Sequence, residues 1–374
     1  MHIAYFTNSD SFRRDVLRNK QVSFQYPGSG WLSCLYEFAS IRGIDVASGD
    51  VALENVSRGK WSAKDILVIQ DLDCTLAQGL LQNGATPFML TCFEAPLYAP
   101  FFYDKARSIS AKFKLRCGFD LTNVDYNPQA SDIFGPLKFP SYYLNDLVPL
   151  DDSWDWGSKK RLVLVAANKY KSSKMFLPKD AHLKDWFRQL KWLYWRSISP
   201  SYRDSLKLCL HESRLEAIEF FARHGSIDLY GAGWEVMAGL PMGWVSRLLG
   251  HSGIRIHGVC GNKLQVLKEY QFALCYENCA LAGYITEKII DCFVAGVVPI
   301  YRGAPDVSYH IPTGAFLSAD HLNFDELLCR MNGIGGINSR SIVQCGRDYL
   351  NSKHGKLHSY EGFAEAVLDV ALSC

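Results

Sequence analysis

This sequence of 374 residues has no long apolar run and no recognisable secretory signal peptide. No stretch approaches the roughly 18 apolar residues that a membrane-spanning helix needs. The first ten residues, MHIAYFTNSD, lack the basic segment followed by an apolar segment that forms a secretory signal peptide. These absences predict a cytoplasmic protein that does not span a membrane; a shortened form of an anchored protein is the alternative, and the Met1 start favours the first.

An excess of charge of either sign is also missing. Lys and Arg number 40 against 38 Asp and Glu, which gives a net charge of +2. This balance provides no electrostatic basis for binding nucleic acid, so we expect no such partner. The 12 cysteines include no C-x-x-C pair. In a long chain without a signal peptide they are expected to be reduced, mostly buried thiols, and we expect no structural zinc site.

The common nucleotide-binding glycine motifs are absent as well. Gly231-Ala232-Gly233 is not followed by the third glycine of a dinucleotide fingerprint, which disfavours a dehydrogenase. The loop 27–30 lacks the Gly-Lys-Ser/Thr of a P-loop, and we interpret it as a turn. Asp71-Leu72-Asp73 matches a metal-binding Asp-x-Asp motif, but matches this short arise often by chance. We interpret it as the turn at the end of a strand.

What the sequence does contain is an alternation of strand-like and helical segments. The length suggests two domains, and 48% hydrophobic residues are typical of a globular protein. The predicted strands include 2–7, 44–47, 65–70, 86–93, 161–166 and 227–230, and the predicted helices include 31–41, 206–223 and 360–372. Such alternation indicates an α/β fold of parallel βαβ units.

The acidic, glycine-containing segment 150–158 is typical of a linker between domains. It divides the chain into an N-terminal domain, 1–150, and a C-terminal domain, 151–352. The remaining residues, 353–374, are expected to form a C-terminal helix.

The most informative stretch is 270–303, YQFALCYENCALAGYITEKIIDCFVAGVVPIYRG. An apolar run predicts a strand over 272–276, and polar and small residues predict a loop after it. Thr286 is a good N-cap, Glu287 suits the first helical turn, and Gly296 suits the end of the helix. A second buried strand follows at 297–301. The loop therefore lies at the carboxyl end of a strand and the N-terminus of a helix, where α/β folds bind phosphates and sugars.

Four polar residues of this loop and first turn are our candidate binding residues: Asn278, Tyr284, Glu287 and Lys288. A charged pair in a first helical turn is by itself an ordinary feature of a helix surface. The density of polar groups at a strand end favours a binding site.

The stretch closely resembles the signature of the α-1,3/1,4-fucosyltransferases, glycosyltransferase family 10. The matching positions are Tyr276-Glu277-Asn278, Tyr284-Ile285-Thr286-Glu287-Lys288 and Val298-Pro299-Ile300-Tyr301-Arg302-Gly303. Cys279 stands where the family has a serine. The resemblance implies a GT-B fold, in which two Rossmann-like domains face a central cleft. It also implies that the N-terminal domain binds the acceptor and the C-terminal domain binds GDP-fucose.

Weaker similarity extends to both halves of the chain. Glu94 ends an apolar strand and is followed by Pro96, as is the general base of the family; a solvated loop carboxylate is the alternative. The segment 139–143 resembles the family's Pro-x-Tyr-Tyr segment. Arg214 is our candidate for the arginine that contacts the donor phosphates in the family, with Arg223 as its rival.

The resemblance implies an inverting enzyme that moves L-fucose from GDP-β-L-fucose to a hydroxyl of an N-acetylglucosamine-containing oligosaccharide or glycoconjugate. Lys288 and Arg214 would neutralise the leaving diphosphate, so we expect that no metal or other cofactor is required. Asn278 and Tyr284 can donate hydrogen bonds to phosphate or sugar. Whether Glu287 binds ribose or fucose stays open. The alternatives are a transferase that uses another nucleotide sugar and a non-catalytic nucleotide- or sugar-binding relative.

The segment 168–202 is rich in basic and aromatic residues and resembles an insertion. Phe187, Leu190 and Tyr194 share one helical face, beside Lys191. Aromatic helix faces usually pack into a core. A basic amphipathic helix can also lie on a membrane, so peripheral membrane contact through 184–196, or contact with the acceptor, is the alternative.

Overall fold

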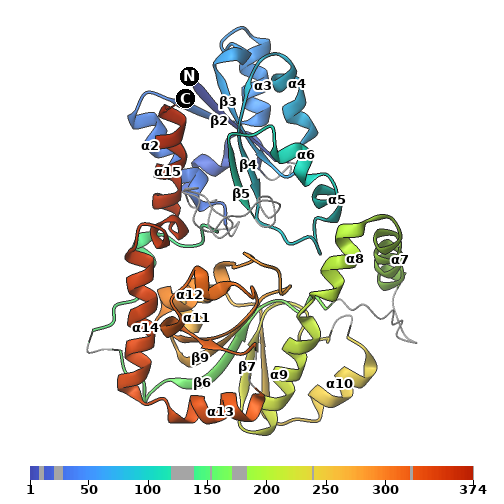
Figure 1. Cartoon of the computed structure of the whole chain (residues 1–374), viewed down its shortest axis with the longest axis vertical. Coiled ribbons are helices and arrows are strands. Elements are labelled where there is room, and N and C mark those ends of the chain that lie inside the picture. The colour runs from blue at the N-terminus through green and yellow to red at the C-terminus, as the bar shows by residue number, and fades with distance from the viewer. Residues whose placement is uncertain are drawn as a thin grey trace. The chain divides into compact units, whose positions relative to one another are not determined.

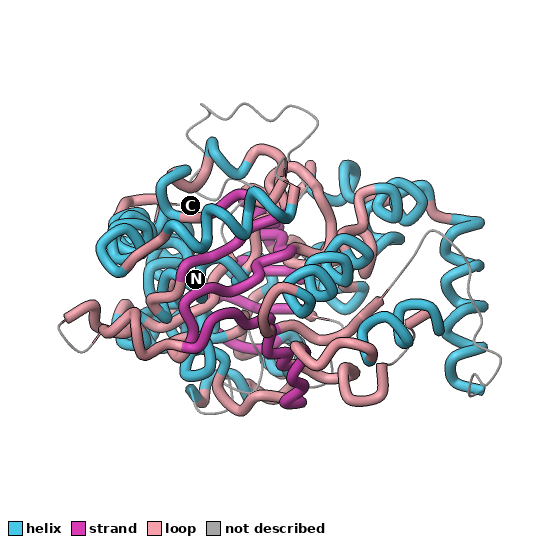
Figure 2. Tube along the Cα trace, turned by 90° about the horizontal axis from the view of Figure 1, so that it is seen from below, coloured by secondary structure: helices cyan, strands magenta, loops and turns pink. Residues whose placement is uncertain are grey.

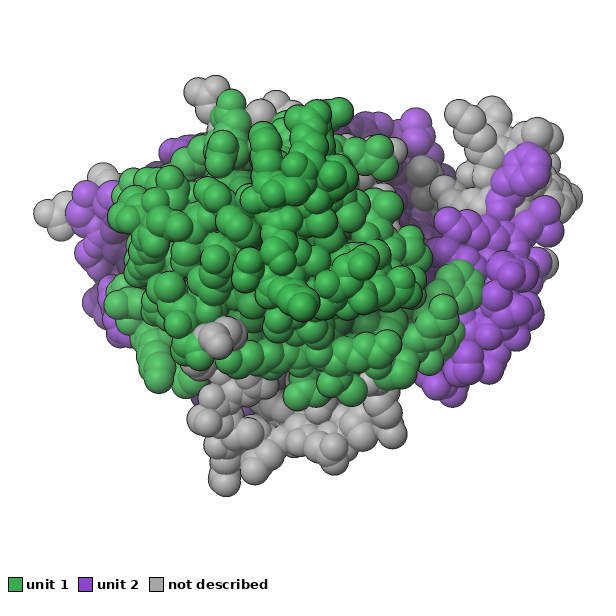
Figure 3. Space-filling view, turned by 90° about the horizontal axis from the view of Figure 1, so that it is seen from above, with its two compact units in different colours: residues 1–94, 101–145, 350–374 green, residues 95–100, 146–349 purple. Residues whose placement is uncertain are grey.

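The computed structural model describes residues 1–7, 12–20, 28–118, 139–151, 154–170, 183–237, 240–320 and 323–373. It divides into two compact units, drawn in different colours in Figure 3. Unit 1 comprises 1–94, 101–145 and 350–374, and unit 2 comprises 95–100 and 146–349. Within the described ranges, no helix is long and apolar enough to cross a membrane.

Unit 1 is built on a parallel sheet of five strands in the order β2-β1-β3-β4-β5 (Figure 1). The strands are β1 (His2–Phe6), β2 (Asp45–Ser48), β3 (Ile66–Asp71), β4 (Thr86–Cys92) and β5 (Leu115–Gly118). The helices are α2 (Gly30–Ile41), α3 (Gly49–Ser57), α4 (Gln78–Gln82), α5 (Pro100–Tyr103), α6 (Ala106–Ser110) and α15 (Tyr360–Leu372).

Both faces of this sheet are covered, because successive residues of a strand point to opposite sides. Ile3 of β1 packs in a core with α2 and α15, whereas its neighbour Ala4 packs in a second core with α3 and α4. In β3, Leu67 and Val68 divide between the same two cores. The continuous apolar runs of these strands are therefore explained by burial on both sides.

The end of the chain belongs to unit 1. Tyr142, within the predicted 139–143 segment, forms a parallel bridge with Ser359. The ring of Tyr143 lies 4.7 Å from that of Tyr360, the first residue of α15. The residues 353–374, expected as a separate C-terminal helix, therefore complete the core of unit 1.

Unit 2 is built on a parallel sheet of six strands in the order β11-β10-β9-β6-β7-β8. The strands are β6 (Lys160–Val165), β7 (Ile227–Tyr230), β8 (Ile254–Gly258), β9 (Tyr270–Tyr276), β10 (Val298–Arg302) and β11 (Leu317–Ser318). Numbered from β6, this is the Rossmann order, in which the winding reverses between the first and fourth strands. The reversal point of unit 2 therefore lies between β6 and β9, where ligands bind in such sheets.

The strands of both units run between flanking helices (Figure 2). Between β6 and α15 the helices are α7 (Leu183–Ile198), α8 (Pro200–Lys207), α9 (His211–Arg223), α10 (Met242–Leu249), α11 (Lys263–Leu267), α12 (Glu287–Ala295), α13 (Phe324–Gly333) and α14 (Gly336–Asn351). Residues of α9, α10, α13 and α14 share one core with the strands, and α11 and α12 pack on the same sheet. Short 3₁₀ helices are 16–18, 63–65, 75–77, 144–146, 307–309, 313–315 and 355–358.

One helix prediction was wrong. The segment 206–223 was expected to be a single helix, but the helix breaks at 208–210. There Cys209 forms an antiparallel bridge with Cys279, and the backbone N–H of Leu210 donates to the carbonyl of Asn278 over 3.0 Å. The break follows from these long-range hydrogen bonds, which helical periodicity cannot reveal.

Candidate functional site

The signature stretch folds as the sequence predicts, as strand, loop, helix and strand. β9 ends at Tyr276, α12 begins at Glu287, and β10 pairs in parallel with β9. Gly296 ends α12 in the left-handed conformation, with φ of 72°, as a C-terminal glycine should. The loop thus lies at the carboxyl end of β9, beside the reversal point of the sheet.

Glu277, the first residue after β9, is the centre of the polar contacts in this loop. Its carboxylate is fully buried. It accepts hydrogen bonds from the backbone N–H of Thr286 (2.8 Å), from the Thr286 hydroxyl (2.8 and 3.0 Å) and from Lys288 Nζ (2.9 Å). These contacts hold the start of α12 against the end of β9.

Thr286 occupies the N-cap position of α12, but its side chain does not cap the helix. Its hydroxyl donates to Glu277 and accepts from Lys288 Nζ over 2.8 Å. Thr286 is thus the N-cap residue, as predicted, but its hydroxyl bonds to Glu277 and Lys288 rather than to the backbone of α12.

Lys288 has two hydrogen-bond acceptors among the residues that the structure describes. An ammonium group has three N–H donors, and two of them point to Glu277 Oε2 and Thr286 Oγ1. Glu287 Oε1, at 3.6 Å, is beyond hydrogen-bond distance. Burial alone would lower the pKa of Lys288, but the carboxylates of Glu277 and Glu287 raise it above its ordinary value. Lys288 is therefore a charged, positioned donor whose side chain is 13% exposed.

Glu287 lies between two lysines. Its Oε1 is 3.6 Å from Lys288 Nζ and 3.8 Å from Lys263 Nζ. Burial would raise the pKa of Glu287, but the charges of Lys288 and Lys263 outweigh it and hold the pKa at about 2. Lys263 also contacts Asp291 Oδ2 over 2.7 Å. Lys263 and Asp291 were not predicted to be part of the site. They lie on different helices and are far apart in the sequence, so no sequence pattern indicates that they pair.

Arg214 joins the same site from the first turn of α9. It is 4% exposed, and its Nη2 donates to the carbonyls of Tyr276 (2.8 Å) and Glu277 (3.2 Å) and to Asn278 Oδ1 (3.2 Å). Its Nε is buried with no hydrogen-bond partner among the residues that the structure describes. Its rival Arg223 is at the other end of α9 and pairs with Glu219, so it is not brought to the signature loop.

Asn278 and Tyr284 face each other across the loop. Asn278 Nδ2 lies 3.5 Å from the hydroxyl of Tyr284, while its Oδ1 accepts from Arg214. Cys279, which replaces the family's serine, is buried, and its Sγ is 3.9 Å from the carbonyl of Ser205 in α8. The cysteine that departs from the signature therefore packs against α8.

Glu94 is exposed and belongs to unit 1. Its backbone carbonyl accepts a hydrogen bond from the Tyr103 hydroxyl over 2.7 Å. The next residues, 95–100, belong to unit 2. There the Tyr98 hydroxyl lies 3.3 Å from Nε2 of His211, which begins α9. The chain thus passes from Glu94 directly into a segment that contacts the helix bearing Arg214.

Asp71, interpreted from the sequence as part of a simple turn, ends β3 close to Glu94. Leu72 after it has φ of 53°, in the left-handed region that a non-glycine residue seldom adopts. Thr91 Oγ1 donates to Asp71 Oδ1 over 3.1 Å. Burial and the negative charge of Glu94 raise the pKa of Asp71 to about 6, although the hydrogen bond from Thr91 opposes the shift. Two carboxyl groups therefore share the carboxyl edge of this sheet.

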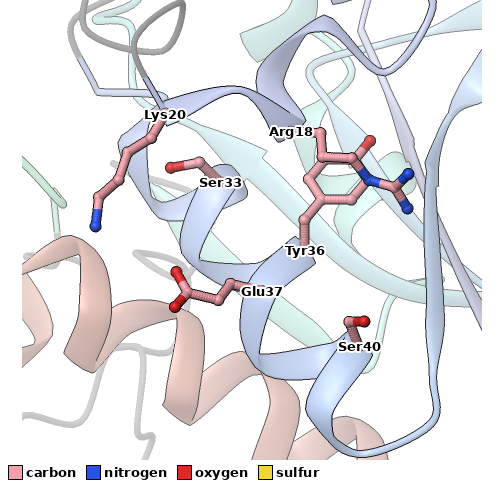
Figure 4. A pocket seen from close by; sticks show the side chains of 6 residues that line it. All are labelled: Arg18, Lys20, Ser33, Tyr36, Glu37 and Ser40. Atoms are coloured by element: carbon pink, nitrogen blue, oxygen red, sulfur yellow. The ribbon is translucent and has the colours of Figure 1, made fainter.

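A separate hollow of about 430 Å³ lies beside α2 in unit 1 (Figure 4). It is lined by Arg18, Lys20, Ser33, Tyr36, Glu37 and Ser40. None of these residues belongs to the signature or to the predicted site.

No group of three or more His, Cys, Asp or Glu side chains suited to a metal ion occurs in the described ranges. Lys288 pairs instead with Glu277 of the signature loop, and Lys263 of α11 pairs with Asp291 of α12. The loop thus offers positive charge and hydrogen-bond donors to a ligand.

The fold resembles that of a solved structure. Sucrose-phosphate synthase from Thermosynechococcus elongatus matches with a TM-score of 0.61 and 9% identity, over 100% of this chain and 98% of that one. At such low identity the likeness concerns the fold alone. The two parallel-sheet α/β units define the GT-B class, which confirms the predicted fold class.

A family model matches part of the sequence. The model of "Glycosyltransferase family 10 (fucosyltransferase) C-term" matches residues 207–335. The matched residues contain the signature, so the resemblance to this family that the signature indicates is confirmed.

Individual relatives match over short regions. The α-(1,3)-fucosyltransferase FucT of Helicobacter pylori is 33% identical over 104 residues, which are 28% of this chain and 22% of that protein. GDP-fucose protein O-fucosyltransferase 3 of Gallus gallus is 40% identical over 53 residues, 14% of this chain and 11% of that protein. The alignments thus span less than a quarter of each relative.

The raised pKa of Asp71 predicts a pH-dependent effect of Asp71→Asn on stability. The folded chain holds this proton more tightly than the unfolded chain, whose carboxyl titrates near 3.8. The stabilisation is complete below pH 4 and is lost as the pH rises through about 6. Relative to the unaltered chain, the Asp71→Asn variant should therefore become more stable as the pH rises from 4 to 7. The difference between their free energies of unfolding should change by about 1–3 kcal/mol over this range.

Denaturant unfolding of the full chain and of the variant at a series of pH values measures this difference. Asp50→Asn is the control, because its effect on stability should change with pH in the opposite direction. Burial would raise the pKa of Asp50, but hydrogen bonds from Ser48 and the Arg14 backbone lower it. Its replacement should cost more as the pH rises. A difference for Asp71→Asn that does not change with pH would contradict the raised pKa.

Proposed function

We propose that this protein transfers L-fucose from GDP-β-L-fucose to a hydroxyl of an N-acetylglucosamine-containing glycan. The observation that carries the proposal is the group formed by Glu277, Thr286 and Lys288 at the reversal point of the unit 2 sheet. It presents a charged donor at a helix N-terminus, the arrangement that binds a diphosphate. The names of two relatives, an α-(1,3)-fucosyltransferase and a GDP-fucose protein O-fucosyltransferase, support fucose as the sugar.

In this proposal unit 2 binds the donor. Lys288 donates its third N–H to the diphosphate, and the N-terminus of α12 adds backbone donors. Arg214 fixes the strand end and Asn278, and contributes positive charge at the same place. Asn278 and Tyr284 offer hydrogen bonds to the phosphate or sugar. Glu287, which its lysine neighbours keep ionised, accepts from a sugar hydroxyl of the donor.

Glu94 of unit 1 is proposed as the general base. It takes the proton of the acceptor hydroxyl while that oxygen bonds to the anomeric carbon of fucose. The bond from that carbon to the diphosphate breaks, and GDP leaves with the electron pair. One base without a covalent nucleophile gives inversion, so the β-linked donor yields an α-linked product. Turnover then needs both units, whereas donor binding needs only unit 2.

Positive charge from Lys288 and Arg214 takes the part of a metal in stabilising the leaving GDP. We therefore propose that no metal cofactor is needed. The acceptor class and a cytoplasmic location stay predictions.

The main alternative is a relative that binds nucleotide or sugar without turnover, and the second is a transferase for another nucleotide sugar. The deciding experiment incubates the purified chain with GDP-fucose, GDP-mannose and UDP-sugars, with and without N-acetyllactosamine. We expect release of GDP from GDP-fucose and a fucosylated product whose linkage NMR assigns. GDP affinity without turnover would favour the first alternative, and turnover of a different sugar would favour the second.

Lys288→Ala should weaken GDP binding by roughly tenfold to a hundredfold, because a charge-assisted hydrogen bond contributes about 1.5–3 kcal/mol. Isothermal titration calorimetry measures the affinity. Lys160→Ala is the matched control, since Lys160 forms a lysine–glutamate pair of the same 2.9 Å length with Glu269, but at the amino end of β6, away from the carboxyl ends of the strands. It should leave GDP affinity unchanged.

Removing Lys288 alone leaves the carboxylate of Glu277 buried without its partner, which can disturb the start of α12. The double variant Lys288→Met with Glu277→Gln removes both charges. It should keep its folded circular dichroism spectrum and still bind GDP weakly. Affinity equal to that of the unaltered chain in both variants would exclude Lys288 from the donor site.

Glu94→Gln should lower the turnover number by about 10²–10⁴-fold, the usual contribution of a general base. Its GDP affinity should not change, because Glu94 belongs to unit 1 and the donor residues to unit 2. Steady-state assays and calorimetry on one preparation separate the two quantities. Full turnover in this variant would remove Glu94 from the mechanism.

Chelation tests the role given to Lys288 and Arg214. After dialysis against EDTA the turnover number should stay within about twofold of its value with added Mg²⁺ or Mn²⁺, since fixed cations stabilise the leaving group. Activity that disappears with EDTA and returns with one metal would show that these side chains do not suffice.

A further inference from the structure

Helix α7 carries a stripe of large apolar side chains that are open to solvent. The stripe consists of Phe187, Leu190, Tyr194 and Ile198, which are 65%, 55%, 59% and 47% exposed. Their spacing of three and four residues puts them on one helix face. The expectation that this face packs into the core is therefore wrong. Clustered exposed apolar residues mark a surface that binds something.

The side of α7 that packs against the protein is a different one. Trp195 meets Tyr202 of α8 edge to face, with ring centroids 5.5 Å apart. Arg203 of α8 donates its Nη1 to the carbonyls of Arg196 and Ser197 at the end of α7. α8 therefore holds α7 on the Trp195 side, and α7 runs along the edge of unit 2 away from the strands (Figures 1 and 2).

The part of the sequence that contains this helix is also the part with the greatest excess of basic residues. Residues 168–207 contain ten Lys and Arg against three Asp, a net charge of +7, whereas the whole chain carries +2. The rest of the chain is therefore acidic overall. Lys191 and Arg196 of α7, and Arg203 and Lys207 of α8, are exposed.

We propose that α7 lies on the surface of an anionic lipid bilayer, with the stripe inserted among the acyl chains and the basic residues facing lipid phosphates. An apolar face flanked by Lys and Arg is the pattern of helices that lie in a membrane interface. Each basic residue near such a surface adds to the attraction. Because the residues beside the stripe are basic, we expect lipid with anionic headgroups to be bound in preference to neutral lipid.

Other occupants fit these observations less well. A nucleic acid or an acidic polysaccharide would use the basic residues, but would leave the aliphatic side chains of Leu190 and Ile198 in water. A second copy of the chain would bring two surfaces of the same charge together, which opposes association. A bilayer satisfies both the apolar stripe and the charge.

The proposed membrane helix is tied to the signature loop within unit 2. Just beyond α8, the Leu208 carbonyl accepts from the backbone N–H of Ala280 over 2.7 Å, and Leu210 N–H donates to the Asn278 carbonyl over 3.0 Å. If the proposed function holds, bilayer contact through α7 fixes the donor loop relative to the membrane. The docking itself does not depend on that function.

The experiment measures co-sedimentation of the full chain with vesicles. We expect binding to vesicles of equal parts phosphatidylcholine and phosphatidylglycerol, little binding to phosphatidylcholine alone, and weakening with added salt. The variant Phe187→Ser/Leu190→Ser/Tyr194→Ser should bind the anionic vesicles roughly tenfold or more weakly. It lacks the apolar side chains whose transfer from water into lipid favours binding. Lys191→Glu/Arg196→Glu should also weaken binding.

The control is Tyr309→Ser/Ile337→Ser, which removes apolar side chains that are 80% and 85% exposed elsewhere on the chain. It should bind vesicles as the unaltered chain does. Equal vesicle binding by the stripe variant overturns the proposal. So does tighter binding to heparin or polyuridylate than to vesicles, or a dimer in sedimentation velocity that the stripe variant abolishes.

Two measurements separate this proposal from the proposed function. The stripe variant should bind GDP as tightly as the unaltered chain does. The Lys288→Ala variant should bind vesicles as tightly as the unaltered chain does. Loss of vesicle binding in Lys288→Ala would mean that binding reports the donor site rather than α7, and would overturn the docking proposal.

Discussion

The buried carboxylate of Glu277 is the constraint on which the candidate site depends. A fully buried charge is costly unless it is paired and hydrogen-bonded, and Glu277 is satisfied by Thr286 and Lys288 together. The same contacts set where α12 begins and where Lys288 points. Charge and geometry in this loop are therefore inseparable, since moving the lysine would leave the carboxylate uncompensated.

The sheet topology explains why this group lies at the carboxyl ends of the strands. β6 and β9 are neighbours although many residues separate them in the chain, and the winding of the sheet reverses between them. The crossover helices leave on opposite sides at such a point and keep the carboxyl ends of the strands open. Arg214 reaches this edge from α9 and holds the carbonyls at the end of β9. A Rossmann sheet thus supplies both the position and the backbone groups.

The division of the chain gives Glu94 an unusual setting. It is followed at once by the segment 95–100, which belongs to unit 2 and touches His211 through Tyr98. Its neighbour Asp71 shares the edge of the unit 1 sheet and holds its proton to about pH 6. The proposed base is thus linked along the chain to the unit that bears the proposed donor site, and its electrostatic environment is negative.

The sequence by itself determined the α/β class, the bounds of β7 and α15, the strand–loop–helix–strand order of 270–303 and the resemblance of this stretch to a known family. These follow from apolar periodicity and from capping residues, which act between near neighbours in the chain. Only the tertiary structure decided that Glu277 anchors Lys288, that Lys263 joins Glu287, and that the apolar face of α7 is exposed. Such pairings depend on which strands lie side by side and on what covers each helix, and local patterns in the sequence carry no record of either.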